Sequence, residues 1–193
     1  MRIACARTWI VFFLFLSASP QISILHADEQ RPGLSPAPFF YGMRVGVLAH
    51  DVNHLWSRSR AESGLDWNVE LVFSRPGWFA GPGRVLSNIG ASINNRSGTS
   101  KLYGGLVWEA LFGGVFFFNT GAGLALHDGD LDHDESNGKQ LGSRLLFRVP
   151  LEVGVSWGGR HRLSLMFDHV SNAYLANPNE GLDTLGLRYG FQF

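Results

Sequence analysis

The chain has 193 residues, enough for one domain, and its 16 basic and 16 acidic side chains give a formal charge of zero. A single cysteine excludes an intrachain disulfide, and the balanced charge gives no sign of nucleic-acid binding. Glycine (24) and phenylalanine (15) are both abundant for a chain of this length.

The N-terminal segment has the pattern of a secretory signal peptide. Arg2 and Arg7 precede an apolar run that is too short to span a membrane as a helix. We expect cleavage after Ala27, so that residues 28–193 form the mature domain. Cleavage removes Cys5 and both of these arginines, which leaves fourteen basic against sixteen acidic residues and a formal charge of −2.

Eight later segments alternate apolar with polar or small residues, which is the period of a β-strand. Most are close to the ~9–11 residues with which a tilted strand crosses a bilayer, and no later run approaches the ~18 apolar residues of a spanning helix. The segments lie near residues 41–50, 63–74, 86–95, 100–110, 113–126, 141–157, 161–172 and 183–193. This pattern predicts an all-β fold, an eight-stranded antiparallel transmembrane β-barrel of the outer membrane.

The faces opposite the apolar ones carry charges of both signs, which a closed barrel can pair in its lumen. These residues are Arg44, Glu70, Glu109, Arg144, Arg148, Glu152, Asp168 and Arg188. Eight strands leave no room for a wide channel, which argues against porin activity. A soluble lipocalin-like barrel, with its apolar face turned inward around a ligand, is the alternative. The terminal Phe193 favours the membrane barrel, because outer-membrane proteins commonly end on an aromatic residue.

An even number of strands places both termini on the periplasmic side, and the connections at 51–62, 96–99, 127–140 and 173–182 then face outward. The third of these contains alternating acidic residues from His127 to Glu135. Their spacing does not fit a calcium loop. A divalent-cation site and a plain solvated loop both stay open as interpretations of this segment.

The apolar faces of the last two strands lead to three polar residues that together could hydrolyse an ester. The apolar face of residues 163–167 continues to His169 and Ser171, and Asp183 precedes Leu185 on the apolar face of the final strand. An antiparallel neighbour could place Asp183 beside His169, where the carboxylate would stabilise the imidazolium that forms as the histidine takes the serine proton. The spacing alone favours a polar rim where the strands leave the membrane.

Residues 167–183 read Phe-Asp-His-Val-Ser-Asn-Ala-Tyr-Leu-Ala-Asn-Pro-Asn-Glu-Gly-Leu-Asp, and the chain ends in Leu-Arg-Tyr-Gly-Phe-Gln-Phe. This stretch resembles the lipid A 3-O-deacylase (PagL) family of outer-membrane esterases. The family's His-x-Ser-Asn-Ala and Pro-Asn-x-Gly motifs are present, followed by an acid two residues on. The resemblance is strongest over residues 160–193. It implies that Ser171 is the nucleophile, His169 the general base and Asp183 the acid that orients the base.

One departure from the family concerns this acid. The family has Glu where this chain has Asp183, whose side chain is one methylene shorter, so the two strands must lie closer together. Glu180 is the alternative acid, although it falls in the loop and not on the shared face. Asn172 and Asn179 are the candidate oxyanion-hole donors. Asn179 matches the Pro-Asn position of the family, and both residues also fit a role as turn formers.

Together these features predict an outer-membrane esterase that hydrolyses the 3-O-linked acyl chain of lipid A through an acyl-Ser171 intermediate. We expect the active site to face the outer leaflet and to need no metal or other cofactor. The expected partners are lipopolysaccharide and the outer membrane, and the barrel also allows a homodimer. The alternatives are a catalytically inactive structural or adhesive barrel, a soluble lipid-binding barrel, and an enzyme that modifies lipid A at another position.

Overall fold

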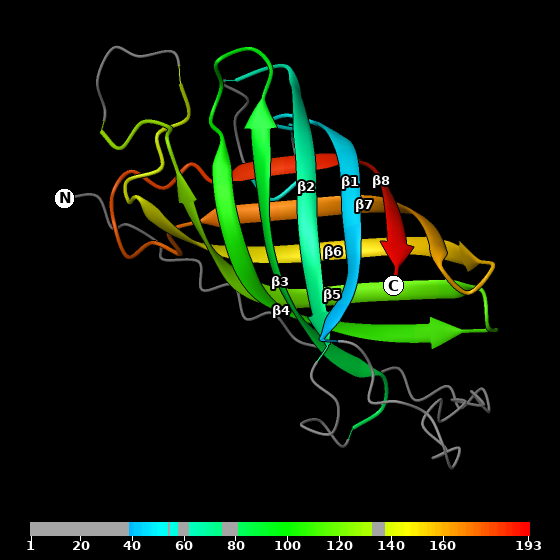
Figure 1. Cartoon of the computed structure of the whole chain (residues 1–193). Coiled ribbons are helices and arrows are strands. Elements are labelled where there is room, and N and C mark those ends of the chain that lie inside the picture. Colours follow the sequence, from blue (N-terminus) through cyan, green and yellow to red (C-terminus); the bar gives the residue numbers. More distant parts are fainter. Residues whose placement is uncertain (1–38, 54, 58–61, 75–80, 133–137) are drawn as a thin grey trace.

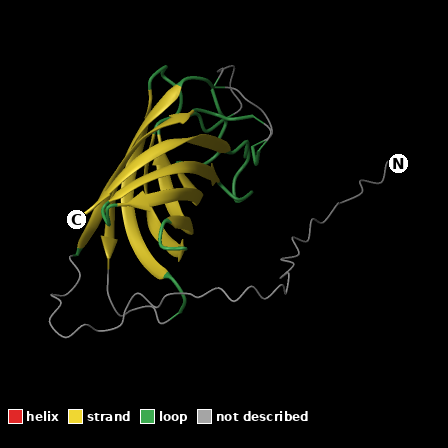
Figure 2. Cartoon of the chain, turned by 90° about the vertical axis from the view of Figure 1, so that its right-hand side faces the viewer, coloured by secondary structure: helices red, strands yellow, loops and turns green. Residues whose placement is uncertain are grey.

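The computed structural model describes residues 39–53, 55–57, 62–74, 81–132 and 138–193. Among them are eight strands, which are β1 (Phe40–Ala49), β2 (Leu65–Ser74), β3 (Arg84–Asn94), β4 (Lys101–Phe112), β5 (Phe116–His127), β6 (Leu145–Trp157), β7 (His161–Ser171) and β8 (Leu182–Gln192). Each strand pairs antiparallel with the next, and β8 pairs with β1, so the sheet closes into a barrel (Figures 1 and 2). The predicted eight-stranded antiparallel barrel is confirmed. None of the described residues forms a helix long and apolar enough to cross a membrane.

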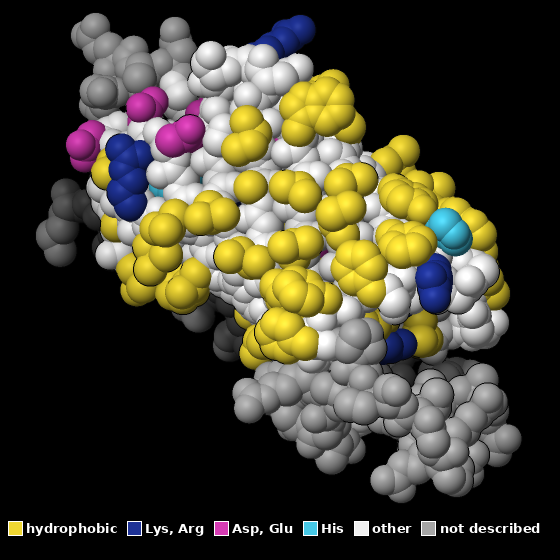
Figure 3. Space-filling model, in the orientation of Figure 1, with side chains coloured by type: hydrophobic (Ala, Val, Ile, Leu, Met, Phe, Trp, Pro, Cys, Tyr) yellow, Lys and Arg dark blue, Asp and Glu magenta, His cyan; other side chains and the backbone are white. Residues whose placement is uncertain are grey.

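Apolar side chains cover the outer wall of the barrel. On β2, for example, Trp67, Val69 and Leu71 are exposed while Asn68 and Glu70 between them are buried. Figure 3 shows hydrophobic side chains spread across the middle of the wall, with charged side chains gathered toward its two ends. A soluble barrel with its apolar face turned inward is therefore excluded.

Paired charges fill the lumen. Arg188 Nη2 lies 3.3 Å from Glu70 Oε1 and 2.9 Å from Glu152 Oε2, and Arg148 Nε lies 2.6 Å from Asp168 Oδ1. Buried charges are costly unless they are paired, and here each charge has an oppositely charged neighbour. Seven of the eight charged residues expected in the lumen are buried there, as the sequence predicted.

Two strand boundaries and one lumen residue differ from the sequence prediction. β6 begins at Leu145 and not near residue 141, because Gly142 has a φ of +69° that interrupts the extended chain. Arg144 therefore precedes the strand and is exposed, and its guanidinium donates to the backbone carbonyls of His127, at the end of β5, and of Gly129. β5 begins at Phe116 and not near residue 113, because the glycines at 113 and 114 form the turn after β4.

A buried polar cap closes the barrel at the end that carries the β1–β2, β3–β4 and β5–β6 connections. Its centre is His50, whose Nδ1 and Nε2 atoms each lie 2.7 Å from a carboxylate oxygen, of Asp66 and Glu62 respectively. Glu62 also accepts the backbone N–H groups of Thr99 (2.6 Å) and Lys139 (2.7 Å). The polar cap thus ties these three connections to one another.

The charge on His50 makes the stability of this end pH-dependent. Burial alone would lower the pKa of His50, but hydrogen bonds to Asp66 and Glu62 outweigh burial and raise the pKa from 6.5 to about 9. The protonated ring therefore stabilises the folded state fully below pH 6.5, and this stabilisation is lost as the pH rises through about 9. We expect the Tm of the detergent-solubilised protein, followed by circular dichroism, to fall over this range. His50→Gln should show a smaller fall, and an equal fall in both proteins would contradict the role given to His50.

Candidate active site

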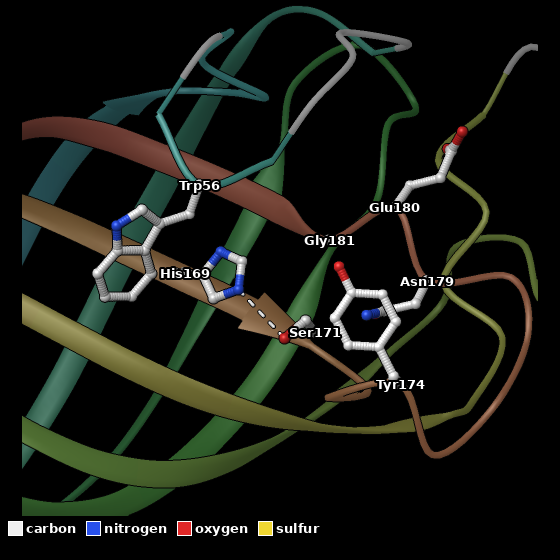
Figure 4. Close-up of a pocket in the computed structure, with 7 residues that line it drawn as sticks. All are labelled: Trp56, His169, Ser171, Tyr174, Asn179, Glu180 and Gly181. Atoms are coloured by element: carbon white, nitrogen blue, oxygen red, sulfur yellow. Dashed lines mark hydrogen bonds between the residues drawn. The ribbon is translucent and has the colours of Figure 1, made fainter. Parts of the chain in front are cut away.

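β7 and β8 bring His169, Ser171 and Asp183 together near one end of the wall. The strand register sets His169 directly opposite Asp183, and Ser171 follows two residues on, on the same face. His169 Nδ1 lies 2.6 Å from Asp183 Oδ1. His169 Nε2 lies 3.1 Å from Ser171 Oγ, the contact marked by the dashed line in Figure 4. The Glu180 carboxylate instead accepts the backbone N–H of Gln140 at 2.9 Å. The structure therefore places Asp183, and not Glu180, at the imidazole.

The direction of these hydrogen bonds follows from the groups that make them. An ionised carboxylate only accepts, so His169 Nδ1–H donates to Asp183, and the neutral Nε2 accepts from the Ser171 hydroxyl. In this arrangement a base can take the proton of a serine while an acid holds the base in the correct tautomer. Asp183 Oδ2 in turn accepts the backbone N–H groups of Trp56 and Ser57, both at 2.7 Å.

A hollow of about 380 Å³ opens beside the Ser171 hydroxyl. Its lining combines aromatic and polar groups, which suits an ester that joins an apolar chain to a polar headgroup. The lining residues are Trp56, His169, Ser171, Tyr174, Asn179, Glu180 and Gly181 (Figure 4).

The two candidate oxyanion donors occupy different positions. Asn179 lines the hollow, and its Oδ1 accepts the backbone N–H of Asn172 at 3.0 Å. This contact leaves the Asn179 Nδ2 group on the side of Ser171 (Figure 4). The Asn172 side chain is buried, and its Nδ2 donates to the carbonyls of Leu141 (2.9 Å) and Pro178 (2.8 Å). Asn172 therefore holds the β7–β8 loop, and Asn179 is the side chain available to an oxyanion.

A strained turn follows the serine directly. The Leu175 N–H donates to the Asn172 carbonyl (3.0 Å) across Ala173 and Tyr174, whose φ angles are +53° and +64°. Such a turn normally contains Asn and Gly, because other residues lose about 1–2 kcal/mol each in this conformation. The strain places Tyr174 at the rim of the hollow with 81% of its surface exposed. Strained backbone of this kind is concentrated at functional sites.

Gly181 leaves room for the imidazole. Its φ is +68°, and a Cβ at this position would lie 3.1 Å from His169 Cε1. We expect Gly181→Ala to lower kcat by about 10²-fold, because a small displacement of the base misaligns it with the serine. The backbone strain should also destabilise the protein by about 1–2 kcal/mol.

Gly159 offers a matched control for this substitution. It has a similar φ of +71°, but a Cβ there would meet nothing within 4 Å. Gly159→Ala should therefore show a similar loss of thermal stability in a melting experiment and keep full activity. Equal activity in the two variants would contradict the role of Gly181 in making space for His169.

The possible cation site in the acidic β5–β6 connection falls partly on residues 133–137, which lie outside the described part of the chain. Among the residues that are described, no group of three or more His, Cys, Asp or Glu side chains is placed to hold a metal ion.

The chain is similar in sequence to one family of known proteins. The family model described as lipid A 3-O-deacylase (PagL) matches residues 61–192, more than half of the chain. The lipid A deacylase PagL of Bordetella bronchiseptica is 31% identical over 97 residues, which are 46% of this chain and 52% of that protein. The chain thus spans about half the length of this curated relative.

Two crystal structures share the fold. The outer-membrane enzyme PagL superposes with a TM-score of 0.59 at 23% identity, over 76% of this chain and 97% of that one. The N-terminal β-barrel domain of Pseudomonas aeruginosa OprF superposes with a TM-score of 0.51 at 11% identity, over 80% and 98% of the two chains. At these identities the superpositions support the barrel architecture alone.

Proposed function

The chain belongs to the lipid A 3-O-deacylase (PagL) family, and we propose that it is an outer-membrane esterase that hydrolyses the 3-O-linked acyl chain of lipid A. The observation that carries the proposal is the hydrogen-bonded series from Ser171 through His169 to Asp183, which opens onto a hollow on the outer wall. A structural barrel has no need for these three side chains to meet in this order.

In the first step the Ser171 oxygen attacks the carbonyl carbon of the ester while His169 Nε2 takes the hydroxyl proton. Asp183 stabilises the imidazolium that results. Negative charge develops on the former carbonyl oxygen, where the Asn179 Nδ2 group can donate a hydrogen bond. The intermediate collapses as the bond to the sugar oxygen breaks, and His169 returns its proton to that oxygen. Ser171 is left acylated.

In the second step His169 takes a proton from water, and the resulting hydroxide attacks the acyl carbon. The bond to Ser171 breaks, the serine regains a proton from His169, and a 3-hydroxy fatty acid leaves. The nucleophile, the base and the oxyanion donor account for both steps with side chains of this chain alone.

The position of the site suits a substrate embedded in a membrane. His169 and Ser171 continue the outward apolar face of β7, which includes the exposed residues Leu163 and Leu165. Lipid A could therefore reach the serine from outside the barrel, without entering a lumen filled with ion pairs. We infer that this end faces the outer leaflet, with residues 1–27 as the export signal and residues 28–193 as the mature domain.

The proposal is tested by the lipid A of cells with and without the protein. Mass spectrometry should show the loss of one 3-hydroxyacyl unit when the protein is produced in a host that lacks such an activity. An unchanged profile, with the barrel folded in the outer membrane, would favour the catalytically inactive structural barrel. Loss of a different acyl chain would indicate another type of lipid A-modifying enzyme.

A further inference from the structure

The connection between β1 and β2 lies over the paired His169 and Asp183. Three of its backbone N–H groups donate to Asp183: that of Val52 to the main-chain carbonyl at 2.9 Å, and those of Trp56 and Ser57 to the side-chain Oδ2 at 2.7 Å each. Because of this cover, Asp183 is fully buried although it lies on the outward face of β8. The connection therefore fixes the acid of the site by contacts that do not involve β7.

The Trp56 indole also contacts the base. Its ring centroid lies 5.0 Å from that of His169, with an interplanar angle of 74°, and 5.3 Å from that of Phe167, at 83°. Figure 4 shows the imidazole between Trp56 on one side and Ser171 on the other. The indole thus limits rotation of the imidazole away from the serine and reduces the access of water to the Nδ1–Asp183 hydrogen bond.

The ends of this connection are anchored in the polar cap. His50 follows β1, and its ring is hydrogen-bonded to Asp66 and Glu62. The Glu62 carboxylate also accepts hydrogen bonds from Thr99 and Lys139, which belong to two further connections. Buried, multiply hydrogen-bonded anchors of this kind restrict the positions that a loop can take. Together with the bonds of the Trp56 and Ser57 N–H groups to Asp183, these anchors hold Trp56 against His169.

We propose that Trp56 is a positioning residue of the active site, which acts through His169 and Asp183 and not through a bond to the substrate. This inference rests on the proposed ester hydrolysis at Ser171. When His169 accepts the serine proton, the imidazolium must stay within reach of both Ser171 and Asp183, and a packed aromatic ring maintains that geometry. Residues 50–57 precede the segment 61–192 that the family model matches.

The test uses the purified full-length protein in detergent, with Trp56→Ala, Trp56→Phe and the matched control Trp157→Ala. Trp157 is also an exposed tryptophan that packs on a histidine, His161 at 5.6 Å between centroids, at the far end of β6 and β7. Trp56→Ala should lower kcat for lipid A deacylation by about 10²-fold with a much smaller change in KM. Trp56→Phe should recover most of this loss, and Trp157→Ala should behave as the wild type.

A small fluorophosphonate separates the role of Trp56 from the choice of substrate. Ser171 Oγ attacks the phosphorus, fluoride leaves and His169 takes the proton, so the labelling rate reports activation of the serine without any lipid chain. We expect Trp56→Ala to slow labelling about as much as it lowers kcat. Equal labelling in wild type and Trp56→Ala, or a rise in KM at unchanged kcat, would overturn the inference. If the wild-type protein is labelled but does not deacylate lipid A, the proposed function is contradicted. Slower labelling of Trp56→Ala would in that case still support the positioning role of Trp56.

Discussion

Replacing Asp183 by Asn is expected to lower kcat for lipid A deacylation by about 10⁴-fold. The Trp56 and Ser57 N–H groups both point at Oδ2, so the carbonyl oxygen of an asparagine would take that place and turn its NH₂ group toward His169 Nδ1. The imidazole would then carry its proton on Nε2, where it could no longer accept the proton of Ser171. The large loss of kcat is thus due to the wrong tautomer of His169, since Asp183→Asn changes the packing little.

Asp183→Glu is the matched comparison for this variant. It keeps the negative charge and restores the residue type found in the family. However, His169 and Asp183 are directly opposite in the register, so the longer glutamate side chain must fold back to fit the space beside His169. We expect a loss that is much smaller than that of Asp183→Asn, measured as kcat on purified lipopolysaccharide. Equal losses in the two variants would show that the charge and the tautomer do not govern the role of Asp183.

The second large effect is expected from Ser171→Ala, which removes the nucleophile and should lower kcat by about 10⁶-fold. The double variant Ser171→Ala with His169→Ala should be no slower, because a base has no function once its serine is gone. Ser156→Ala serves as a control, since Ser156 lies near the other end of β6, where its hydroxyl donates to the Val115 carbonyl. A further large loss in the double variant would mean that His169 acts on some other group, such as a water molecule.

Most of the fold could be predicted from the sequence because a two-residue period determines which way each side chain faces. The alternation in β7 assigns His169 and Ser171 to the same outward face as Leu163 and Leu165, and the alternation in β8 does the same for Asp183. The connection between the antiparallel strands β7 and β8 is of limited length, so only a few pairing registers are possible for these strands. In the observed register, His169 lies opposite Asp183. The grouping of these three residues therefore follows from strand periodicity and a short connection.

The parts that were not predicted depend on contacts between distant segments or on unusual backbone conformations. Trp56 and Asp183 are 127 positions apart, and nothing in the sequence of the β1–β2 connection indicates that it lies over β8. The turn at Ala173 and Tyr174 has none of the Asn-Gly character that normally marks positive φ angles. The inward orientation of Asn172 follows from carbonyl groups of Leu141 and Pro178, which come from two different loops.

The role of Ser171 in lipid A 3-O-deacylation is tested by treating purified lipopolysaccharide with the wild type and with Ser171→Ala, then mapping the lipid A product by tandem mass spectrometry. We predict that the wild type removes one 3-hydroxyacyl chain, that the missing chain is the ester-linked one at the 3-position, and that Ser171→Ala removes none. Removal of a chain from any other position, or equal removal by the two proteins, would contradict the assignment of Ser171 as the nucleophile of a lipid A 3-O-deacylase.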